Sequence, residues 1–465
     1  MRPKLNIQAA ALYIAILLVI VSSLTLFRSG ALWWDETVYL SIADNLYLNH
    51  EYAFNINDEE EFRAPVFPAM IATSYFIFGA SSETIARLAV FAASLLFAFT
   101  IYLLGRKLYG VKIASSGALL AVAAPQFVFW SSKILSEATA VFFTATTLYV
   151  IYIIIEENRK NLYPLLGALL ALSFLTKYPL GLLAILFFAW AVFRKKQRLF
   201  FCKQAVFGAI TFLVILTPWM YNSYDAYGSA FGSASYNAYI VNDLHTGSPD
   251  MYAREFLTYY GIIGALFLAG AAYSIWKKDM PGLFLVSWFL IVFFALSFAI
   301  SEKQIRYLLI ALPSIALLAS RASFALFERF PLKNLLAFIF VLFVALSVFV
   351  PEFENTYNNK NIGLLVEDAG LYLREHAPEG TLIMSQSAPP YHYYSKHKVI
   401  WFPKDKWAIM DFMYRYNVSY VEIDNHAWHP DYVLNYFENN NYFTLEYNKS
   451  EGDKFVLLYR YFDDH

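Results

Sequence analysis

The sequence predicts an α-helical polytopic membrane protein that carries a small soluble α/β domain at its C-terminus. Of the 465 residues, 59% are hydrophobic and only 15% are charged. This balance is typical of a chain that folds in a bilayer rather than in water. The apolar residues also occur in runs of roughly 15 to 21, about the length of a helix that crosses the hydrocarbon core.

Eleven apolar runs are expected to span the membrane. They are residues 7–27, 84–105, 112–130, 137–155, 162–176, 178–193, 203–219, 256–275, 280–300, 305–320 and 332–350. The first run follows a basic start but is too long and too apolar for a cleaved signal peptide, so we expect it to be retained.

The charges of the loops indicate whether a twelfth apolar stretch, residues 66–78, crosses the membrane. If it does not cross, seventeen Lys and Arg residues lie on the side of the N-terminus and seven in the opposite short loops. Since short cytoplasmic loops are enriched in Lys and Arg, the N-terminus is predicted to be cytoplasmic. If the stretch did cross, this bias would reverse after the first span. We therefore expect an interfacial or re-entrant helix that begins at Pro65 and ends at Gly79.

This topology divides the chain into a membrane domain, residues 1–350, and an extracytoplasmic domain, residues 351–465. The membrane domain has two large external loops, 28–82 and 221–254, and the first is expected to hold interfacial helices. In the C-terminal part, helical patterns alternate with short strand patterns, which predicts a small α/β domain. The helical patterns cover 362–375 and 407–416, and the strand patterns 381–385 and 420–423.

Composition excludes some classes of function. The formal net charge of −1 gives no basic field for nucleic acid. A single cysteine, Cys202, excludes an intramolecular disulfide and argues against a Cys-based metal cluster.

The ionisable residues collect at the outer ends of the expected spans. Arg87 is the only charged residue that lies more than two residues inside the end of a span. The others are Asp35, Glu36, Arg63, Lys133, Glu137, Lys177, Lys303 and Arg306. A transporter or flippase for a lipid-linked sugar usually keeps ionisable groups near the midplane, so this pattern favours work at the outer surface. Three alternatives stay open: a flippase or transporter for a lipid-linked sugar, ordinary interfacial anchors, and a non-catalytic scaffold that presents the C-terminal domain.

Asp35 and Glu36 directly follow Trp33 and Trp34 after the first span. A general base needs only one carboxylate placed to take a proton from an acceptor hydroxyl. Adjacent helical residues point about 100° apart, so the two are not expected to share one role or to form a glycosidase pair.

Short motifs in this order resemble the polyprenyl-phosphate-sugar glycosyltransferases of the membrane-embedded C-type (GT-C) fold, which include protein O-mannosyltransferases and lipid A aminoarabinose transferases. The motifs are Trp34-Asp35-Glu36-Thr37-Val38-Tyr39, Arg63-Ala64-Pro65-Val66-Phe67-Pro68, Ala86-Arg87-Leu88, Ser136-Glu137, Leu175-Thr176-Lys177, Thr217-Pro218-Trp219 and Arg306-Tyr307-Leu308-Leu309. Val38 departs from the pattern, because aminoarabinose transferases have a basic residue there.

The resemblance implies an inverting transfer of a monosaccharide from dolichyl or undecaprenyl phosphate to a hydroxyl of a protein, glycan or glycolipid. Asp35 would be the base, with Glu36 in a secondary role. Arg63, Lys177 and Arg306 would bind the donor phosphate, because preorganised cations stabilise a leaving phosphate. Arg87 and Glu137 would support the site, Arg87 through a salt bridge that holds the Asp35 loop.

The second large external loop supplies further candidate contacts. Four tyrosines of the second large loop are candidates for stacking on a sugar or for an interfacial aromatic belt: Tyr224, Tyr227, Tyr236 and Tyr239. No metal is expected. Asp243 and His245 are a weak pair, and a divalent ion, if one were used, would belong at Asp35 and Glu36.

Overall fold

A computed structural model describes residues 7–26, 31–54, 63–243, 247–359, 363–403, 405–426, 430, 432–438 and 440–462. The chain forms two compact units. Met1–Phe27 and Glu59–Tyr357 make the helical unit, and Arg28–Asp58 and Asn358–His465 make the mixed unit. The expected division near residue 351 is therefore accompanied by a second feature: the first part of the first large loop folds with the C-terminal domain.

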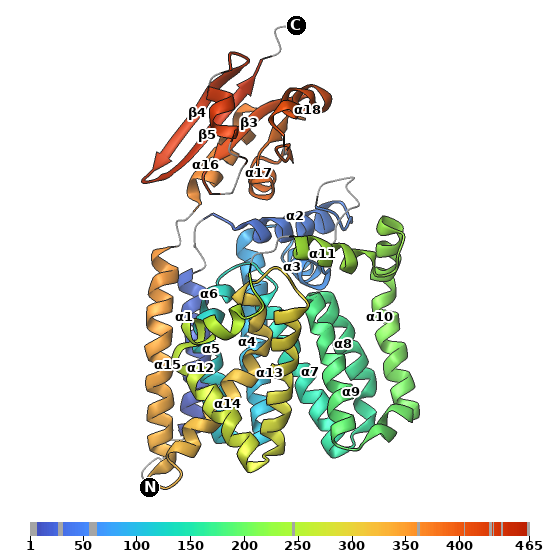
Figure 1. Ribbon diagram of the computed structural model, residues 1–465, viewed down its shortest axis with the longest axis vertical. Helices are drawn as coiled ribbons and strands as arrows, with labels where there is room; N and C mark the ends of the chain where they lie inside the picture. The colour runs from blue at the N-terminus through green and yellow to red at the C-terminus, as the bar shows by residue number, and fades with distance from the viewer. Residues whose placement is uncertain are drawn as a thin grey trace. The chain divides into compact units, whose positions relative to one another are not determined.

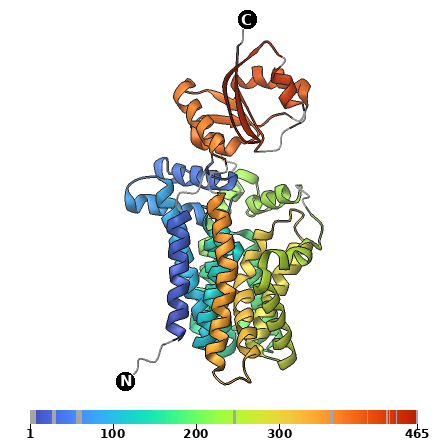
Figure 2. The same cartoon turned by 90° about the vertical axis from the view of Figure 1, so that its left-hand side faces the viewer.

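The helical unit is a bundle of helices joined by short connections (Figure 1). Its α-helices are α1 Ile7–Leu26, α3 Val66–Phe78, α4 Glu83–Tyr109, α5 Val111–Ala123, α6 Pro125–Ser131, α7 Glu137–Glu157, α8 Tyr163–Thr176, α9 Leu182–Phe193, α10 Lys203–Tyr227, α11 Gly232–Asp243, α12 Met251–Lys277, α13 Met280–Phe298, α14 Leu312–Leu326 and α15 Lys333–Asn358. The 3-10 turns are η1 Lys160–Leu162, η2 Tyr178–Gly181, η3 Gln197–Phe201 and η4 Ile305–Ala311. In both views α15 lies beside α1 (Figures 1 and 2).

The protein is a multi-pass membrane protein. In the described part of the chain, seven helices are long and apolar enough to cross a bilayer, or up to eight if the bent pair α5 and α6 counts as one span. The expected number of eleven is not confirmed. α8 and α9 account for part of the difference, because they have 14 and 12 residues where a full crossing needs about 20.

The difficult stretch at 66–78 forms a short helix with the expected bounds. α3 has 13 residues, with Pro65 at its N-cap and Gly79 at its C-cap. Gly79 has φ 71°, a left-handed conformation that glycine adopts without strain. α3 is shorter than a full span, as an interfacial or re-entrant helix requires.

Glycines allow two pairs of helices to pack closely. A Cβ atom on Gly167 of α8 would lie 2.0 Å from the carbonyl oxygen of Gly208 in α10. A Cβ on Gly270 of α12 would lie 2.1 Å from the carbonyl oxygen of Leu318 in α14. Small residues at such crossings bring helix backbones together in membranes, where packing replaces the hydrophobic effect as the source of association.

The chain bends sharply between α5 and α6. The two helices meet at 58°, with Pro125 at the start of α6. Proline cannot donate to the helical hydrogen-bond ladder and disfavours a helical conformation in the residue before it, here Ala124. The bend separates α6 from the direction of α5, and a short connection then leads from α6 to α7.

The mixed unit is built on a five-stranded sheet of order β2-β1-β3-β5-β4. β1 is parallel to β2 and β3, whereas β5 is antiparallel to β3 and β4. The strands are β1 Leu382–Met384, β2 Lys398–Ile400, β3 Val418–Asp424, β4 Phe443–Glu451 and β5 Lys454–Tyr461, and the helices are α2 Trp34–Leu48, α16 Leu364–His376, α17 Ala388–Ser395, α18 Ile409–Tyr416 and α19 Val433–Glu438, with the turn η5 Lys406–Ala408. The predicted α/β character of the C-terminal part is confirmed.

Candidate functional site

Three charged residues meet where α7, α8 and η4 reach the same end of the helical unit. Glu137 is the first residue of α7. Lys177 follows α8 in an extended conformation, two residues before Pro179, which helps to end the helix there. Arg306 lies in η4, ahead of α14. The sequence thus brings each side chain to a helix end, and the fold brings the three ends together.

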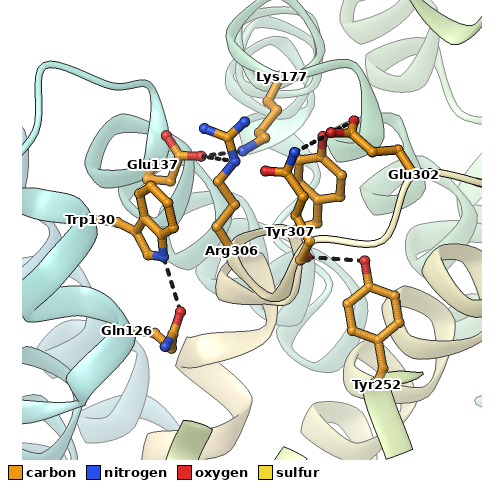
Figure 3. Close-up of polar contacts among 9 residues, drawn as sticks. Gln126, Trp130, Glu137, Lys177, Tyr252, Glu302, Arg306 and Tyr307 are labelled. Atoms are coloured by element: carbon orange, nitrogen blue, oxygen red, sulfur yellow. Dashed lines mark hydrogen bonds and ion pairs between the residues drawn. The ribbon is translucent and has the colours of Figure 1, made fainter. Parts of the chain in front are cut away.

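The Glu137 carboxylate holds both cations (Figure 3). Lys177 Nζ donates to Glu137 Oε1 at 2.8 Å, and Arg306 Nε lies 4.0 Å from the same oxygen. The side chains of Lys177, Arg306 and Glu137 are only 16%, 14% and 3% exposed. Two cations therefore share one carboxylate in a poorly hydrated place, where an anion gains more from a fixed positive charge than it would in water.

Aromatic side chains surround the two cations. The Arg306 guanidinium lies 5.3 Å from the ring centre of Trp130 and 5.7 Å from that of Tyr307. Lys177 Nζ lies 5.4 Å from the ring of Tyr307. Trp130 donates from Nε1 to Oε1 of Gln126 at 3.0 Å, which fixes the indole. These rings attract the cations and limit the rotamers that they can adopt.

A hydrogen-bonded loop, residues 299–304, positions η4. Tyr307 donates its hydroxyl to Oε2 of Glu302 at 2.5 Å, and the Gln304 amide donates to the other carboxylate oxygen. Tyr252 donates to the Gln304 carbonyl at 3.1 Å. Lys303 donates to the carbonyls of Leu296, Ser297 and Ile300 at the end of α13. Burial lowers the pKa of Lys303. Lys303 thus caps a helix.

Sequence reasoning did not select Trp130, Glu302 or Tyr307 as functional side chains. Tyr307 stands next to Arg306 in a quoted motif, and that adjacency was the available signal. No comparable signal singled out Trp130, because 19% of the chain is aromatic and one more tryptophan does not stand out.

The other two arginines of the predicted site lie in the same unit. Arg63 is half-buried, two residues before Pro65 and the start of α3. Arg87 is buried in α4 and donates from Nη1 to the carbonyl of Ser132 at 3.1 Å. This bond ties α4 to the connection between α6 and α7, so Arg87 supports the turn that precedes Glu137. The predicted salt bridge of Arg87 to the Asp35 loop stays a prediction.

Asp35 and Glu36 lie in the first turn of α2, in the mixed unit. Glu36 is 1% exposed, and its Oε2 accepts from the backbone N–H of Trp33 at 2.8 Å. This contact caps the N-terminus of α2. Asp35 is half-buried on the neighbouring position. The two carboxylates therefore differ in environment, as expected for adjacent helical residues, and Glu36 has a structural task.

The C-terminal part of the mixed unit contacts α2 at several points. The backbone N–H of Leu32 donates to the hydroxyl of Tyr394 in α17 at 2.8 Å, in a buried contact. Trp34 packs against Trp401 with ring centres 5.1 Å apart. Lys396 Nζ lies 3.4 Å from Oδ2 of Asp44. The first two contacts fix the first turn of α2 from a chain segment some 360 residues away, and the third lies farther along the helix.

The remaining candidate residues, the tyrosines of the second large loop and the Asp243/His245 pair, lie apart from the Glu137 cluster in the sequence. In the second large loop, the rings of Tyr227 and Tyr236 lie 5.2 Å apart and those of Tyr236 and Tyr239 6.5 Å apart. Asp243 ends α11, whereas His245 lies outside the described residues. Within the described ranges, no group of three or more His, Cys, Asp or Glu side chains could hold a metal ion. Metal dependence at Asp35 and Glu36 stays untested.

One family model matches the chain. Residues 63–221 match the family described as dolichyl-phosphate-mannose-protein mannosyltransferase. The matched segment contains Arg63, Glu137 and Lys177. No curated protein sequence is significantly similar to the chain.

Solved structures resemble almost the whole chain. ArnT from Cupriavidus metallidurans in the apo state superimposes with a TM-score of 0.73 at 14% identity, over 97% of this chain and 98% of that one. The chain has the GT-C fold. The same ArnT bound to undecaprenyl phosphate gives a TM-score of 0.70 at 15% identity, over 97% of both chains.

A larger protein of known structure shares this fold. The apo oligosaccharyltransferase from Archaeoglobus fulgidus gives a TM-score of 0.68 at 15% identity, over 90% of this chain and 70% of that chain. The predicted resemblance to GT-C proteins is thereby confirmed, and at these identities it establishes the fold.

Proposed function

We propose that the protein is an inverting membrane glycosyltransferase. It moves a monosaccharide from a polyprenyl-phosphate donor to an acceptor hydroxyl on the extracytoplasmic side. The observation that carries the proposal is the pair of enclosed cations, Lys177 and Arg306, that share the carboxylate of Glu137.

The charge of this cluster suits the donor. Counting Lys177 and Arg306 against Glu137 leaves one formal positive charge. A polyprenyl-phosphate sugar carries one negative charge, and its phosphate gains a second as the bond to the sugar breaks. Fixed cations bind the more highly charged phosphate more strongly, so the cluster would stabilise the transition state more than the ground state. Arg63 is the third proposed phosphate ligand.

Asp35 is proposed as the general base. The acceptor hydroxyl gives its proton to the Asp35 carboxylate while its oxygen forms a bond to C1 of the sugar. The bond between C1 and the phosphate oxygen breaks on the opposite face, and the polyprenyl phosphate leaves with the bonding electrons. This single displacement inverts the anomeric centre. Glu36, which caps α2, would keep Asp35 in place.

Ligands bound to proteins of similar fold support the proposed classes of donor and acceptor. ArnT has been solved bound to undecaprenyl phosphate. The Archaeoglobus fulgidus oligosaccharyltransferase AglB has been solved in complex with an inhibitory peptide and a dolichol-phosphate, at a TM-score of 0.65 and 14% identity. These ligands favour a lipid-phosphate donor and an acceptor approached from water. The excess of Lys and Arg in the loops on the N-terminal side favours an extracytoplasmic site.

The test is sugar transfer by the purified protein in nanodiscs. Radiolabelled dolichyl- and undecaprenyl-phosphate sugars are offered as donors, with an endogenous membrane extract as acceptor. We expect transfer from at least one donor, and a loss of about tenfold to a hundredfold in kcat/KM for Lys177→Ala, the scale of a charged hydrogen bond. Lys133→Ala, at the same end of the bundle, is the matched control. No transfer from any donor would contradict the proposal and favour a flippase or a scaffold.

A further inference from the structure

A polar pocket lies at the end of the helical unit opposite to Glu137. It has a volume of about 480 Å³ and is lined by residues from the end of α4, the start of α5, the last turn of α14 and the start of α15. Tyr109, which lines it, ends the 27-residue helix whose first turns hold Arg87. At 1.5 Å per residue, the pocket is far from the proposed donor site. Its size is within the range of small-ligand sites.

The lining of this pocket is positively charged. Lys112, Arg321 and Lys333 line it together with one acidic residue, Glu328. The helices α5 and α15 begin at Val111 and Lys333, so two helix N-termini add partial positive charge to the same place. The three cations come from three helices that converge on one hollow, unlike the scattered cations of an ordinary membrane interface.

Arg321 is held in position but keeps donor capacity. Its guanidinium lies 5.0 Å from the ring centre of Tyr273 and 5.8 Å from that of Tyr109. Nε forms an ion pair with Oδ2 of Asp279 at 3.9 Å, a distance too long for a direct hydrogen bond. Nε is enclosed, and among the described residues it has no hydrogen-bond acceptor. A planar guanidinium fixed by two rings can present its N–H groups to phosphate oxygens without a further loss of side-chain entropy.

Exposed apolar side chains flank the pocket. Leu326, Phe330 and Leu332 are 58%, 54% and 73% exposed, and they belong to the segment between the lining residues Arg321 and Lys333. Apolar side chains can pack against the acyl chains of a lipid, whereas they offer no favourable contact to a free ion in water. The combination of cations with neighbouring apolar surface indicates an amphipathic anion.

We propose that this pocket binds the phosphate headgroup of an anionic phospholipid. Lys112, Lys333 and Arg321 would contact the phosphate, and the acyl chains would lie along the apolar side chains of the α14–α15 connection. Basic pockets between membrane helices bind anionic headgroups in this way. The site is independent of the proposed transferase activity, since none of its residues belongs to the Glu137 cluster or to α2.

The test measures lipid binding by native mass spectrometry on the full-length protein, delipidated in a non-ionic detergent. Dioleoylphosphatidylglycerol and dioleoylphosphatidylcholine are titrated separately. We expect tight retention of one phosphatidylglycerol and an affinity about 25-fold weaker in the Lys112→Ala/Lys333→Ala variant, about fivefold for each exposed lysine. Glu328→Gln removes the one lining anion and should strengthen binding several-fold. Both substitutions are at exposed side chains, so neither should prevent folding.

The matched control is Lys277→Ala/Lys278→Ala, which removes two exposed lysines from the end of α12 without touching the pocket. Its phosphatidylglycerol affinity should equal that of the wild type. Equal losses in the two double variants, or equal retention of both lipids by the wild type, would overturn the proposal. Inorganic phosphate is added as competitor. If inorganic phosphate displaced phosphatidylglycerol at a concentration equal to that of the lipid, the pocket would be a site for free phosphate, and the lipid assignment would be contradicted.

Discussion

The two regions proposed to act on the sugar donor are built differently. In the helical unit, the side chains of Lys177 and Arg306 are 16% and 14% exposed and lie around a carboxylate that is 3% exposed. In the mixed unit, Asp35 is half-buried on the first turn of α2, and a hydrogen bond and a tryptophan pair hold that turn to the C-terminal domain. The first region encloses one net positive charge that can receive an anion, whereas the second presents a carboxylate on a helix that the C-terminal domain holds.

This difference predicts that the cation cluster determines binding of the donor phosphate and that the α2 region determines the rate of sugar transfer. Changes in the cation cluster should alter the affinity for lipid phosphate and the stability of the helical unit. Changes around α2 should alter turnover and leave the affinity for the donor unchanged. The following predictions test this separation, beginning with the largest effect.

Asp35→Asn should lower kcat by about 10² to 10⁴, the usual contribution of a general base, with the donor Kd unchanged. The asparagine keeps the shape of the side chain but cannot take a proton at neutral pH. Single-turnover transfer and a direct donor-binding assay on the same preparation measure the two quantities. Asp44→Asn, the same substitution on the same helix, is the control and should keep most of its turnover. Full turnover by Asp35→Asn would remove the base assignment.

Glu137→Gln should lower the Tm of the ligand-free protein by on the order of 5 °C, because two enclosed cations lose their shared anion. Undecaprenyl phosphate should then raise the Tm more in this variant than in the wild type, since its phosphate replaces the missing charge. Thermal unfolding in detergent with and without the lipid measures both. The surface pair Arg254–Glu255 supplies the control, Glu255→Gln. An equal ligand effect in Glu137→Gln and the wild type would show that the phosphate binds elsewhere.

Glu422→Gln tests how the stability of the five-stranded sheet in the mixed unit depends on pH. Glu422 is 1% exposed, and Ser385 Oγ donates to its carboxyl group at 2.5 Å. Burial, and next the charge of Asp424, raise the pKa of Glu422 well above its ordinary value. A raised pKa in the folded state means that stability is fully present below the unfolded pKa and is lost as the pH rises through the folded pKa. The wild-type mixed unit should therefore lose stability on going from acidic to alkaline pH.

The Glu422→Gln variant should lose less stability over the same range. Its unfolding temperature at pH 8 should exceed that of the wild type by about 2–4 °C for each 1 kcal/mol of stability regained, and this gain should vanish at pH 4. Glu375→Gln, at an exposed position of α16, is the control. A gain that is the same at both pH values would contradict the titration of Glu422 as its cause.

Tyr394→Phe should have the smallest effect on catalysis. It removes the acceptor of the buried Leu32 N–H, which costs about 1–3 kcal/mol of local stability. Hydrogen exchange of the first turn of α2 should become faster, and kcat should fall several-fold with the donor Kd unchanged. Tyr414→Phe, whose ring is 81% exposed, should change neither quantity. A weaker donor Kd in Tyr394→Phe would break the proposed separation of binding from chemistry.

The sequence predicted the features that local chemistry determines. Lys177, Glu137 and Arg306 stand at the ends of apolar runs, so their placement at one membrane surface followed from the loop charges. Glu36 was expected in a secondary role beside Asp35, and its hydrogen bond to the N–H of Trp33, which caps α2, was not predicted. The bounds of α3 followed from Pro65 and Gly79, because proline favours the start of a helix and glycine its end.

Other features depend on contacts that no local pattern encodes. The bond between Leu32 and Tyr394 joins residues 362 positions apart, and it groups the first loop with the C-terminal domain. α8 and α9 read as full apolar runs, yet η1 and η2 replace their first turns with 3-10 geometry and leave shorter helices. Trp130 was indistinguishable from the many other aromatic residues until the bend at Pro125 placed it beside Arg306.

The most direct test of the proposed donor site is the Kd for undecaprenyl phosphate of the wild type, Arg306→Gln, Arg306→Lys and the control Lys133→Ala, in one detergent. We expect a Kd about tenfold to a hundredfold weaker for Arg306→Gln and an intermediate value for Arg306→Lys, which keeps the charge but loses the planar fork. Lys133→Ala should match the wild type. An unchanged Kd in Arg306→Gln would contradict the claim that the cluster around Glu137 receives the donor phosphate.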